Sequence, residues 1–168
     1  MDRNNQINTF SRFSRVSRET IKKFIDYEKM LINANKKLNL VGKSTIDQIW
    51  TRHFLDSIQV VDFIDKSDKS LIDIGSGAGF PGLVLAIAAN DRKMNLEVSI
   101  IEKSIKKNIF LNDVVKKLNL NVKVLCQNIY EGEKNTADVG IARAFKPLAK
   151  ILELIHNKVI NSKKIVIF

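Results

Sequence analysis

The first 65 residues carry apolar side chains at the spacing of helices. From Ser17 to Leu38 these side chains recur every three or four residues, which predicts an amphipathic helix whose inner face holds Phe24, Tyr27, Leu31, Ala34 and Leu38. Ser44 is a helix-capping residue, and the stripe after it predicts a second helix, with Ile46, Ile49, Trp50, Phe54, Ile58 and Val61 facing inward. Residues 1–14 are polar and show no clear period, so we expect them to form a mobile arm.

Beyond a polar connector at residues 65–69, short apolar runs alternate with helix-length segments. Strands are predicted at residues 71–74, 96–101, 122–126, 137–142 and 164–168, and helices at 82–89, 104–118 and 147–159. In the second of these helices we expect Ile105, Ile109, Val115 and Leu118 to face inward. Alternating strands and helices favour a parallel sheet with right-handed crossovers. The expected fold is one α/β domain over residues 1–168, in which an arm and helical cap (1–65) precede a Rossmann-like, doubly wound core (70–168).

Length and composition narrow the class of protein. A chain of 168 residues that is 45% hydrophobic is long enough for one domain with an ordinary core. It has no run of about 18 apolar residues, and its first residues lack a signal peptide's apolar segment, so we expect a cytoplasmic protein. The single cysteine, Cys126, excludes an internal disulfide framework and is expected to be buried in a strand, and with only two histidines no metal site is expected.

Positive charge is concentrated near the N-terminus. The formal net charge is +10, and residues 1–45 hold ten basic side chains against four acidic ones. A basic face favours polyanions such as nucleic acid. The chain is also rich in Lys, Asn and Ile, the composition that an AT-rich coding sequence produces, so charge alone leaves nucleic-acid binding open.

The run from Leu71 to Gly82 joins an apolar strand, an acidic residue and four glycines. A strand, a glycine-rich loop and a helix in this order form the nucleotide-binding corner of an α/β sheet. One register, Gly77-x-Gly79-x-x-Gly82, matches the dinucleotide fingerprint, and Glu102 follows where an acidic ribose partner is expected. In that register the first glycine does not directly follow the strand, and a proline falls inside the phosphate turn.

The other register, Asp73-x-Gly75-x-Gly77-x-Gly79, begins directly at the strand end and resembles motif I of class I S-adenosylmethionine-dependent methyltransferases. An acidic residue there suits a ligand with an ammonium and a sulfonium group, and the Glu102 carboxylate has the lone pairs to accept from a ribose diol. Alternatively, Asp73 pairs with the N-terminus of the next helix, and Glu102 is a solvated residue at a strand end. The two acidic residues at this spacing favour the cofactor interpretation.

The resemblance to one methyltransferase family is specific. Residues 75–82, Gly-Ser-Gly-Ala-Gly-Phe-Pro-Gly, resemble motif I of the small-subunit ribosomal RNA guanine-N7 methyltransferases, also called the glucose-inhibited division protein B family. Three further stretches are similar to segments of that family: Asn39–Val41, Arg52–Ser57 and Ala142–Leu148. The resemblance runs from about Phe24 to Phe168.

The resemblance implies a site, a reaction and a partner. The implied reaction is methyl transfer from S-adenosylmethionine to N7 of a guanine in 16S ribosomal RNA, by positioning and without a catalytic base. The partner is the small ribosomal subunit, and we expect a monomer. The cofactor contacts fall on Gly75, Phe80, Ile129, Tyr130 and Arg143, joined by Asp73, Gly77, Gly79 and Glu102. Arg52, His53, Asp56 and Lys146 are the expected contacts to the RNA substrate.

Two stretches depart from the family pattern. Family members read Arg-x-Glu where this chain has Asn128-Ile129-Tyr130, so the adenine contacts here are expected to use backbone groups and the Tyr130 ring. Family members also continue past the fifth strand into a seven-stranded sheet, whereas this sequence ends at Phe168. Two other functions stay open: a non-catalytic RNA-binding or assembly module, which the short C-terminus allows, and an NAD-dependent oxidoreductase that uses the Gly77-x-Gly79-x-x-Gly82 register.

Several candidate residues have structural alternatives. Arg143 is suited to a phosphate, a base edge or the cofactor, or else to an ion pair with Asp138 or Glu153. His53 is suited to a phosphate, or else to a local pair with Asp56. Lys106 and Lys107 face either the cofactor edge or solvent, and the solvated face is favoured.

Overall fold

A parallel sheet forms the centre of the computed structural model, which describes residues 1–131, 134–157 and 159–168. Within these residues five strands lie in the order β3-β2-β1-β4-β5, and every pairing is parallel. The strands are β1 (Ser70–Ile74), β2 (Glu97–Ile101), β3 (Val122–Leu125), β4 (Asn135–Ala142) and β5 (Ile160–Ile167). The predicted doubly wound α/β fold is confirmed, although β4 and β5 begin before the residues that we expected.

The registers bring the ends of the strands to one edge. Ile74 of β1 pairs with Ile101 of β2, and Ile101 pairs with Leu125 of β3. On the other side of β1, Asp73 pairs with Ile141 of β4. Because the chain runs from β1 outward to β3 and then crosses to β4, this edge holds a topological switch point, where ligands of such sheets bind.

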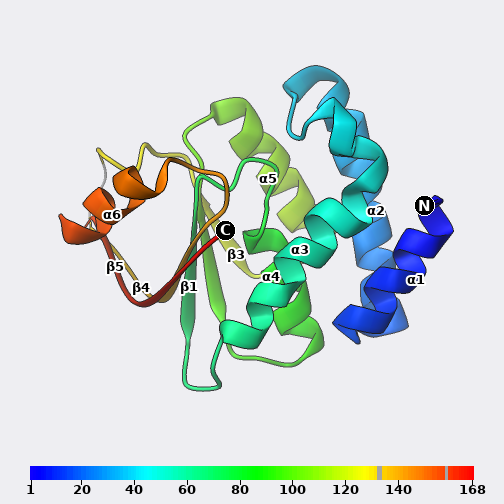
Figure 1. The fold of residues 1–168 in the computed structure, drawn as a ribbon, viewed down its shortest axis with the longest axis horizontal. Coiled ribbons are helices and arrows are strands. Elements are labelled where there is room, and N and C mark those ends of the chain that lie inside the picture. The colour runs from blue at the N-terminus through cyan, green and yellow to red at the C-terminus, as the bar shows by residue number, and fades with distance from the viewer. Residues whose placement is uncertain (132–133, 158) are drawn as a thin grey trace.

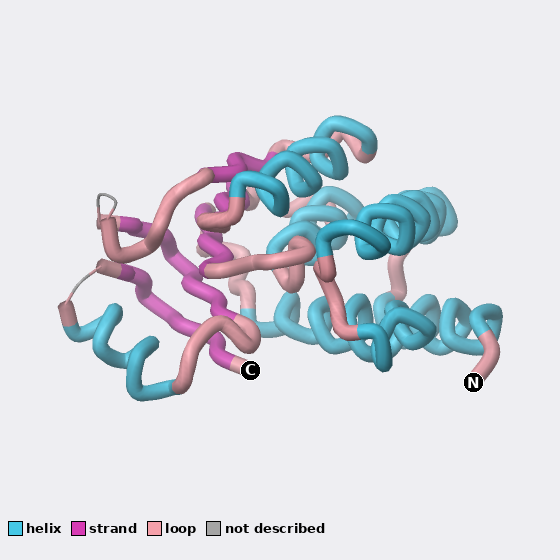
Figure 2. Tube along the Cα trace, turned by 90° about the horizontal axis from the view of Figure 1, so that it is seen from above, coloured by secondary structure: helices cyan, strands magenta, loops and turns pink. Residues whose placement is uncertain are grey.

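Helices cover the two faces of the sheet unequally (Figures 1 and 2). The elements are α1 (Arg3–Ser14), α2 (Arg18–Leu38), η1 (Lys43–Gln48), η2 (Trp50–Leu55), α3 (Asp56–Ile58), η3 (Gln59–Phe63), α4 (Gly82–Asp91), α5 (Ile105–Lys117) and α6 (Leu148–His156). Among the described residues, α6 is the one helix on the face opposite α4 and α5, and its Leu154 belongs to the same buried cluster as Ile72 and Ile74. No helix in the described ranges is long and apolar enough to cross a membrane.

The N-terminal segment is a packed helix, so the prediction of a mobile arm over residues 1–14 is wrong. The Asp2 side chain caps α1 by accepting from the Asn5 amide. Phe10 is fully buried, with its ring centroid 4.8 Å from that of Phe24 and 5.3 Å from that of Trp50. One buried aromatic side chain is worth about 1.5–3 kcal/mol. The signal was missed because the other residues of α1 are mostly polar.

The predicted second helix is a series of short helical turns. Its apolar stripe is confirmed, since Ile49, Trp50, Phe54, Ile58 and Val61 are all buried and Ile46 is partly buried. The backbone nevertheless changes from a 3₁₀-helix (η1) to a π-helix (η2), a short α-turn (α3) and a second 3₁₀-helix (η3). π-Turns are frequent at functional sites.

Two burial predictions in the core are wrong. Ile105 and Ile109 of α5 are exposed, because the helix presents Phe110, Leu111 and Val114 to the core instead; Leu118 is buried as expected. Two stripes at helical spacing were available, and the packing of α5 selects the other one. Cys126 is also exposed, because β3 ends before it.

Candidate functional site

The glycine loop turns tightly at the end of β1. The Gly75 amide donates to the Ile101 carbonyl over 2.8 Å, which continues the β1–β2 ladder by one residue. The amides of Gly79 and Phe80 both donate to the Ser76 carbonyl, over 2.9 and 3.1 Å. Gly77 lies between these turns at φ +60°, and a β-carbon there would meet no atom within 4 Å.

Asp73 lies buried beneath the loop. Its Oδ2 accepts hydrogen bonds from the Ser76 hydroxyl and, over 2.8 Å, from the Gly82 amide at the start of α4. Its Oδ1 is buried and accepts no hydrogen bond from the described residues. Burial raises the pKa of Asp73 to about 6, against the lowering effect of these two hydrogen bonds, and the Glu102 charge raises it further. Asp73 thus organises the loop and the helix start, in line with the alternative that we gave for it.

Tyr27 joins the helical cap to the loop. Its hydroxyl donates a 2.6 Å hydrogen bond to the Ala78 carbonyl, and the whole side chain is buried. A β-carbon at Gly79 would collide with this hydroxyl. Packing of the cap against the loop therefore requires glycine at position 79, whether or not a ligand is bound.

Glu102 connects the loop to α5. Its Oε2 accepts from the Gly77 amide over 3.0 Å, and its Oε1 accepts from the Ser104 amide over 2.8 Å. The side chain is only 6% exposed, yet it lines the cavity described next. Each carboxylate oxygen keeps a further lone pair for a ligand.

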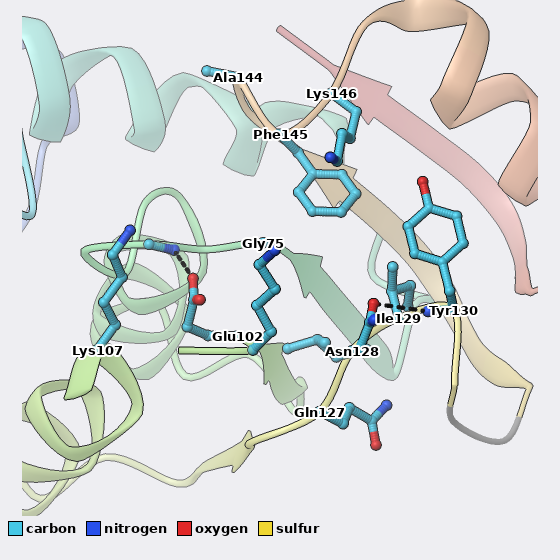
Figure 3. Close-up of a pocket in the computed structure, with 13 residues that line it drawn as sticks. Gly75, Glu102, Lys107, Gln127, Asn128, Ile129, Tyr130, Ala144, Phe145 and Lys146 are labelled. Carbon is cyan, nitrogen blue, oxygen red and sulfur yellow. Dashed lines mark hydrogen bonds between the residues drawn. The ribbon is translucent and has the colours of Figure 1, made fainter. Parts of the chain in front are cut away.

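A cavity of about 410 Å³ opens beside the loop at the carboxyl edge of the sheet (Figure 3). Residues that follow β1, β2, β3 and β4 line it: Gly75, Gly77, Glu102, Lys103, Lys107, Gln127, Asn128, Ile129, Tyr130, Ala144, Phe145 and Lys146, together with Ile101 of β2. Phe145 and Tyr130 present their rings to it from different segments. The volume is within the usual range for small-molecule sites, about 300–1,000 Å³.

The cavity suits a nucleoside ligand. It combines a carboxylate for a diol, apolar and aromatic surface from Ile129, Tyr130 and Phe145, and open space at Gly77 into which only a ligand or water projects. Tyr130 is half exposed and free to contact a base. The lining of the cavity therefore offers the groups that S-adenosylmethionine would need.

Arg143 points away from this cavity and into the cap. Its Nη2 donates to the Arg52 carbonyl over 2.6 Å and lies 3.8 Å from Oδ2 of Asp56, and Nη1 lies 3.5 Å from the Ser57 hydroxyl. Its guanidinium carbon is 5.8 Å from the ring centroid of Phe80. Burial lowers the pKa of Arg143, the Asp56 carboxylate opposes this, and the Arg52 charge lowers it further. Neither ion pair that we named as an alternative forms, because Asp138 pairs with Lys163 and Glu153 with Lys150.

His53 stacks on the aromatic residue of the loop. The rings of His53 and Phe80 have centroids 4.9 Å apart and are inclined by 12°. The His53 Nε2 lies 2.9 Å from the Thr45 hydroxyl, and its Nδ1 is buried with no hydrogen-bond partner in the described part of the chain. Burial, then the charges of Arg143 and Arg52, lower the pKa of His53 to about 4, so the ring is neutral at pH 7. The local pair with Asp56 does not form, because Asp56 pairs with Arg143.

The predicted site residues thus fall into three sets: one lines the cavity, one lies at the boundary between cap and core, and one is buried at the glycine loop. The cavity brings together Gly75, Gly77, Glu102, Ile129, Tyr130 and Lys146. Contacts across the cap–core boundary join Arg52, His53, Asp56, Phe80 and Arg143. Asp73 lies under the loop, and Gly79 is a buried residue of the loop itself. Our sequence reasoning missed Phe145 as a site residue, although it stands in the quoted stretch after β4, and placed Lys107 on a solvated face although it lines the cavity.

Comparison with known proteins points to a single family. A family model described as rRNA small subunit methyltransferase G matches residues 20–168. Three curated relatives named ribosomal RNA small subunit methyltransferase G are similar: one from Pelagibacter ubique (38% identical, 91% of this chain, 73% of the relative), one from Jannaschia sp. (41%, 82%, 65%) and one from Rickettsia akari (42%, 88%, 74%). The chain therefore spans about two thirds to three quarters of the length of these relatives.

Solved structures share the fold. A coclaurine N-methyltransferase bound to N-methylheliamine and S-adenosylhomocysteine superposes with a TM-score of 0.54 at 16% identity, over 98% of this chain and 57% of that one. A precorrin-6y C5,15-methyltransferase from Geobacter metallireducens gives 0.52 at 21% identity, over 79% and 65%. At these identities the likeness concerns the fold alone.

Proposed function

Since the chain belongs to the rRNA small subunit methyltransferase G family, we propose that it transfers the methyl group of S-adenosylmethionine to N7 of a guanine in 16S ribosomal RNA, guanine 527 in that family. The observation that carries this proposal is the cavity at the switch point of the sheet, bounded by Gly75 and Gly77 on one side and by Glu102 and Tyr130 on the others. We place the protein in the cytoplasm, as a monomer, with the small ribosomal subunit as its partner.

The residues of the cavity divide the work of holding the cofactor. Glu102 would accept from the ribose hydroxyls, while Ile129 and Tyr130 would contact the adenine. The backbone of Gly75 and Gly77 would contact the methionine part, with Asp73 fixing the loop from below and Gly79 leaving room for the Tyr27 hydroxyl. Phe80 and Arg143 would hold the loop against the cap, at the boundary between cap and core. When bound, S-adenosylmethionine supplies an electrophilic methyl group on a sulfonium.

The chain needs no general base, because guanine N7 carries an unprotonated lone pair at neutral pH. Its task is to hold N7 in line with the methyl group at about 3–3.5 Å. Lys146 on the cavity, and Arg52, His53 and Asp56 at the cap boundary, are the side chains that we assign to the RNA. Arg52 is the free guanidinium of this set, since the described structure gives its side chain no partner while its carbonyl fixes Arg143.

Calorimetric titration separates this function from the alternatives. We expect one S-adenosylhomocysteine molecule to bind per chain and NAD to give no measurable heat. Tight NAD binding without a response to S-adenosylhomocysteine would sink the proposal and favour an oxidoreductase. RNA binding without any cofactor binding would favour a non-catalytic assembly module.

A further inference from the structure

Lysine side chains surround the proposed cofactor cavity. Lys103, Lys107 and Lys146 line it, and Glu102 is the one carboxylate among the described lining residues. Among the residues that the structure describes, no carboxylate lies within 4.0 Å of any of these three ammonium groups. Lys107 of α5 and Lys146, which precedes α6, reach the cavity from different sides (Figure 3). The lining is therefore net positive, and its positive charges are unpaired.

Lys103 and Lys107 lie at the N-terminal end of α5, where a helix disfavours cations. Lys103 precedes the N-cap Ser104 of α5, Lys106 and Lys107 lie in its first turn, and that turn holds no acidic residue. The N-terminal end of a helix carries a partial positive charge, so cations there are unfavourable and anions favourable. A third lysine from a separate segment, Lys146, adds to the same positive field. An anion bound between these groups would offset their mutual repulsion.

The cofactor does not supply enough negative charge. S-adenosylmethionine has one carboxylate but two cationic groups, the ammonium and the sulfonium, so as a whole it is repelled by a positive lining. Glu102 carries one negative charge, which does not balance the three lysines of the lining. A second, anionic ligand beside the cofactor would neutralise these lysines.

We propose that Lys103, Lys107 and Lys146 form a subsite for phosphodiester groups of the RNA substrate at the cofactor cavity, and that RNA held there increases the affinity for the cationic cofactor. This rests on the proposed function, and it adds a new role for Lys103 and Lys107. The coupling is reciprocal: a cationic cofactor strengthens RNA binding by the same factor. A ligand with a neutral sulfur, such as S-adenosylhomocysteine, shows little of this coupling.

The test compares two probes that cannot react. Sinefungin carries an ammonium group near the position of the sulfonium, and S-adenosylhomocysteine has a neutral thioether. Dissociation constants are measured by calorimetry with and without unmethylated small-subunit RNA. For the wild-type chain we expect RNA to tighten sinefungin binding at least about five-fold, the lower end of common coupling factors, and to change S-adenosylhomocysteine binding less than about two-fold.

The charge-removal variant is Lys103→Gln/Lys107→Gln/Lys146→Gln. We expect it to bind sinefungin more tightly than wild type in the absence of RNA and to lose the coupling. The slope of log K for RNA against log salt should fall by about two, since each lost phosphate contact contributes about 0.7–0.9. The matched control, Lys66→Gln/Lys116→Gln/Lys117→Gln, removes the same charge from exposed positions away from the cavity and should keep the coupling and the slope.

Other outcomes contradict either the proposed subsite or the function on which it rests. A triple variant with wild-type coupling and slope excludes the lysines from RNA binding. Adenosine diphosphate that competes with S-adenosylhomocysteine, and binds the wild type but not the triple variant, would assign the lysines to the pyrophosphate of a free nucleotide. If neither cofactor probe binds the wild type, the proposed function fails, and the salt slope still decides the role of the lysines.

Discussion

The Phe145 ring lies directly against the α-carbon of Gly75, so that a β-carbon at position 75 would collide with the ring. This contact joins the loop after β1 to the segment after β4 across the switch point of the sheet. It also makes Gly75 a packing requirement, whereas the next loop glycine, Gly77, faces open space.

The two glycines therefore predict different outcomes for the same substitution. Gly77→Ala should cost about 1–2 kcal/mol, the penalty of a left-handed conformation, and should weaken S-adenosylhomocysteine binding at least about ten-fold because the new methyl group enters the cavity. Gly75→Ala should destabilise the fold by more, because the collision with Phe145 adds to the same penalty. Denaturant unfolding and calorimetry measure the two effects.

Removing the ring provides the control for this pair. Gly75→Ala/Phe145→Ala should be less destabilised than the sum of its single substitutions, which is the signature of two residues in contact. Additive effects would mean that the ring does not meet position 75. Unchanged cofactor affinity in Gly77→Ala would remove the loop from the binding site.

The hydrogen bond between cap and loop gives a second prediction. Tyr27→Phe leaves the buried Ala78 carbonyl without its donor, which should cost about 1–3 kcal/mol of unfolding free energy. Tyr130→Phe is the matched control, since that hydroxyl is on a half-exposed side chain and should change stability by less than about 0.5 kcal/mol. Equal effects in the two variants would show that Tyr27 does not hold the loop.

The arginine at the cap boundary should not tolerate lysine. Arg143→Lys loses the planar fork that contacts the Arg52 carbonyl, Asp56 and Ser57 together. We expect a loss of about 1–3 kcal/mol, measured by denaturant unfolding. The control is Arg92→Lys, because Arg92 forms a surface ion pair with Asp62 at 3.7 Å. Its free energy of unfolding should lie within about 0.5 kcal/mol of wild type. A similarly small effect of Arg143→Lys would show that Arg143 does not hold the cap against the core.

Asp73 and His53 should make opposite contributions to the pH dependence of the unfolding free energy between about pH 4 and 6.5. The pKa of Asp73 is about 6 in the fold against 3.8 in its ordinary state, so the folded form binds more protons and stability falls as pH rises from about 4 to 6. The pKa of His53 is about 4 against 6.5, so the unfolded form binds more protons and stability rises as pH rises from about 4 to 6.5. The two slopes have opposite signs and offset each other.

Single substitutions should expose each slope. Asp73→Asn should leave the His53 contribution, so its stability rises with pH across this window. His53→Gln should leave the Asp73 contribution, so its stability falls. Midpoints of urea unfolding between pH 4 and 6.5 measure both, and slopes equal to that of wild type in either variant would contradict the assignment.

Much of the core follows from local sequence patterns. The strand predicted at 71–74 and the helix predicted at 82–89 match β1 and α4, and Glu102 follows β2 as expected. Tyr130, which the family resemblance implied, lines the same edge of the sheet. This succeeds because parallel strands that alternate with helices leave few topologies, and each of them collects the strand ends at a single edge.

What the sequence could not predict depends on three-dimensional packing. Phe10 is hidden among polar neighbours, so the helix that it anchors lacks an apolar stripe. In α5 two helical stripes compete, and only contact with the sheet selects Phe110 over Ile109. The direction of Arg143 is set by partners about ninety residues earlier in the chain, which no local pattern reveals.

The most direct measurement of the central claim is methyl transfer itself. Small ribosomal subunits from cells that lack the modification are incubated with labelled S-adenosylmethionine and the wild-type chain, and the digested RNA is analysed by mass spectrometry. Gly77→Ala and the heat-denatured chain are the controls. We expect one 7-methylguanosine per subunit with wild type and far less with both controls. A wild-type chain that binds S-adenosylhomocysteine yet transfers no methyl group, or that methylates another atom, would contradict the proposed function.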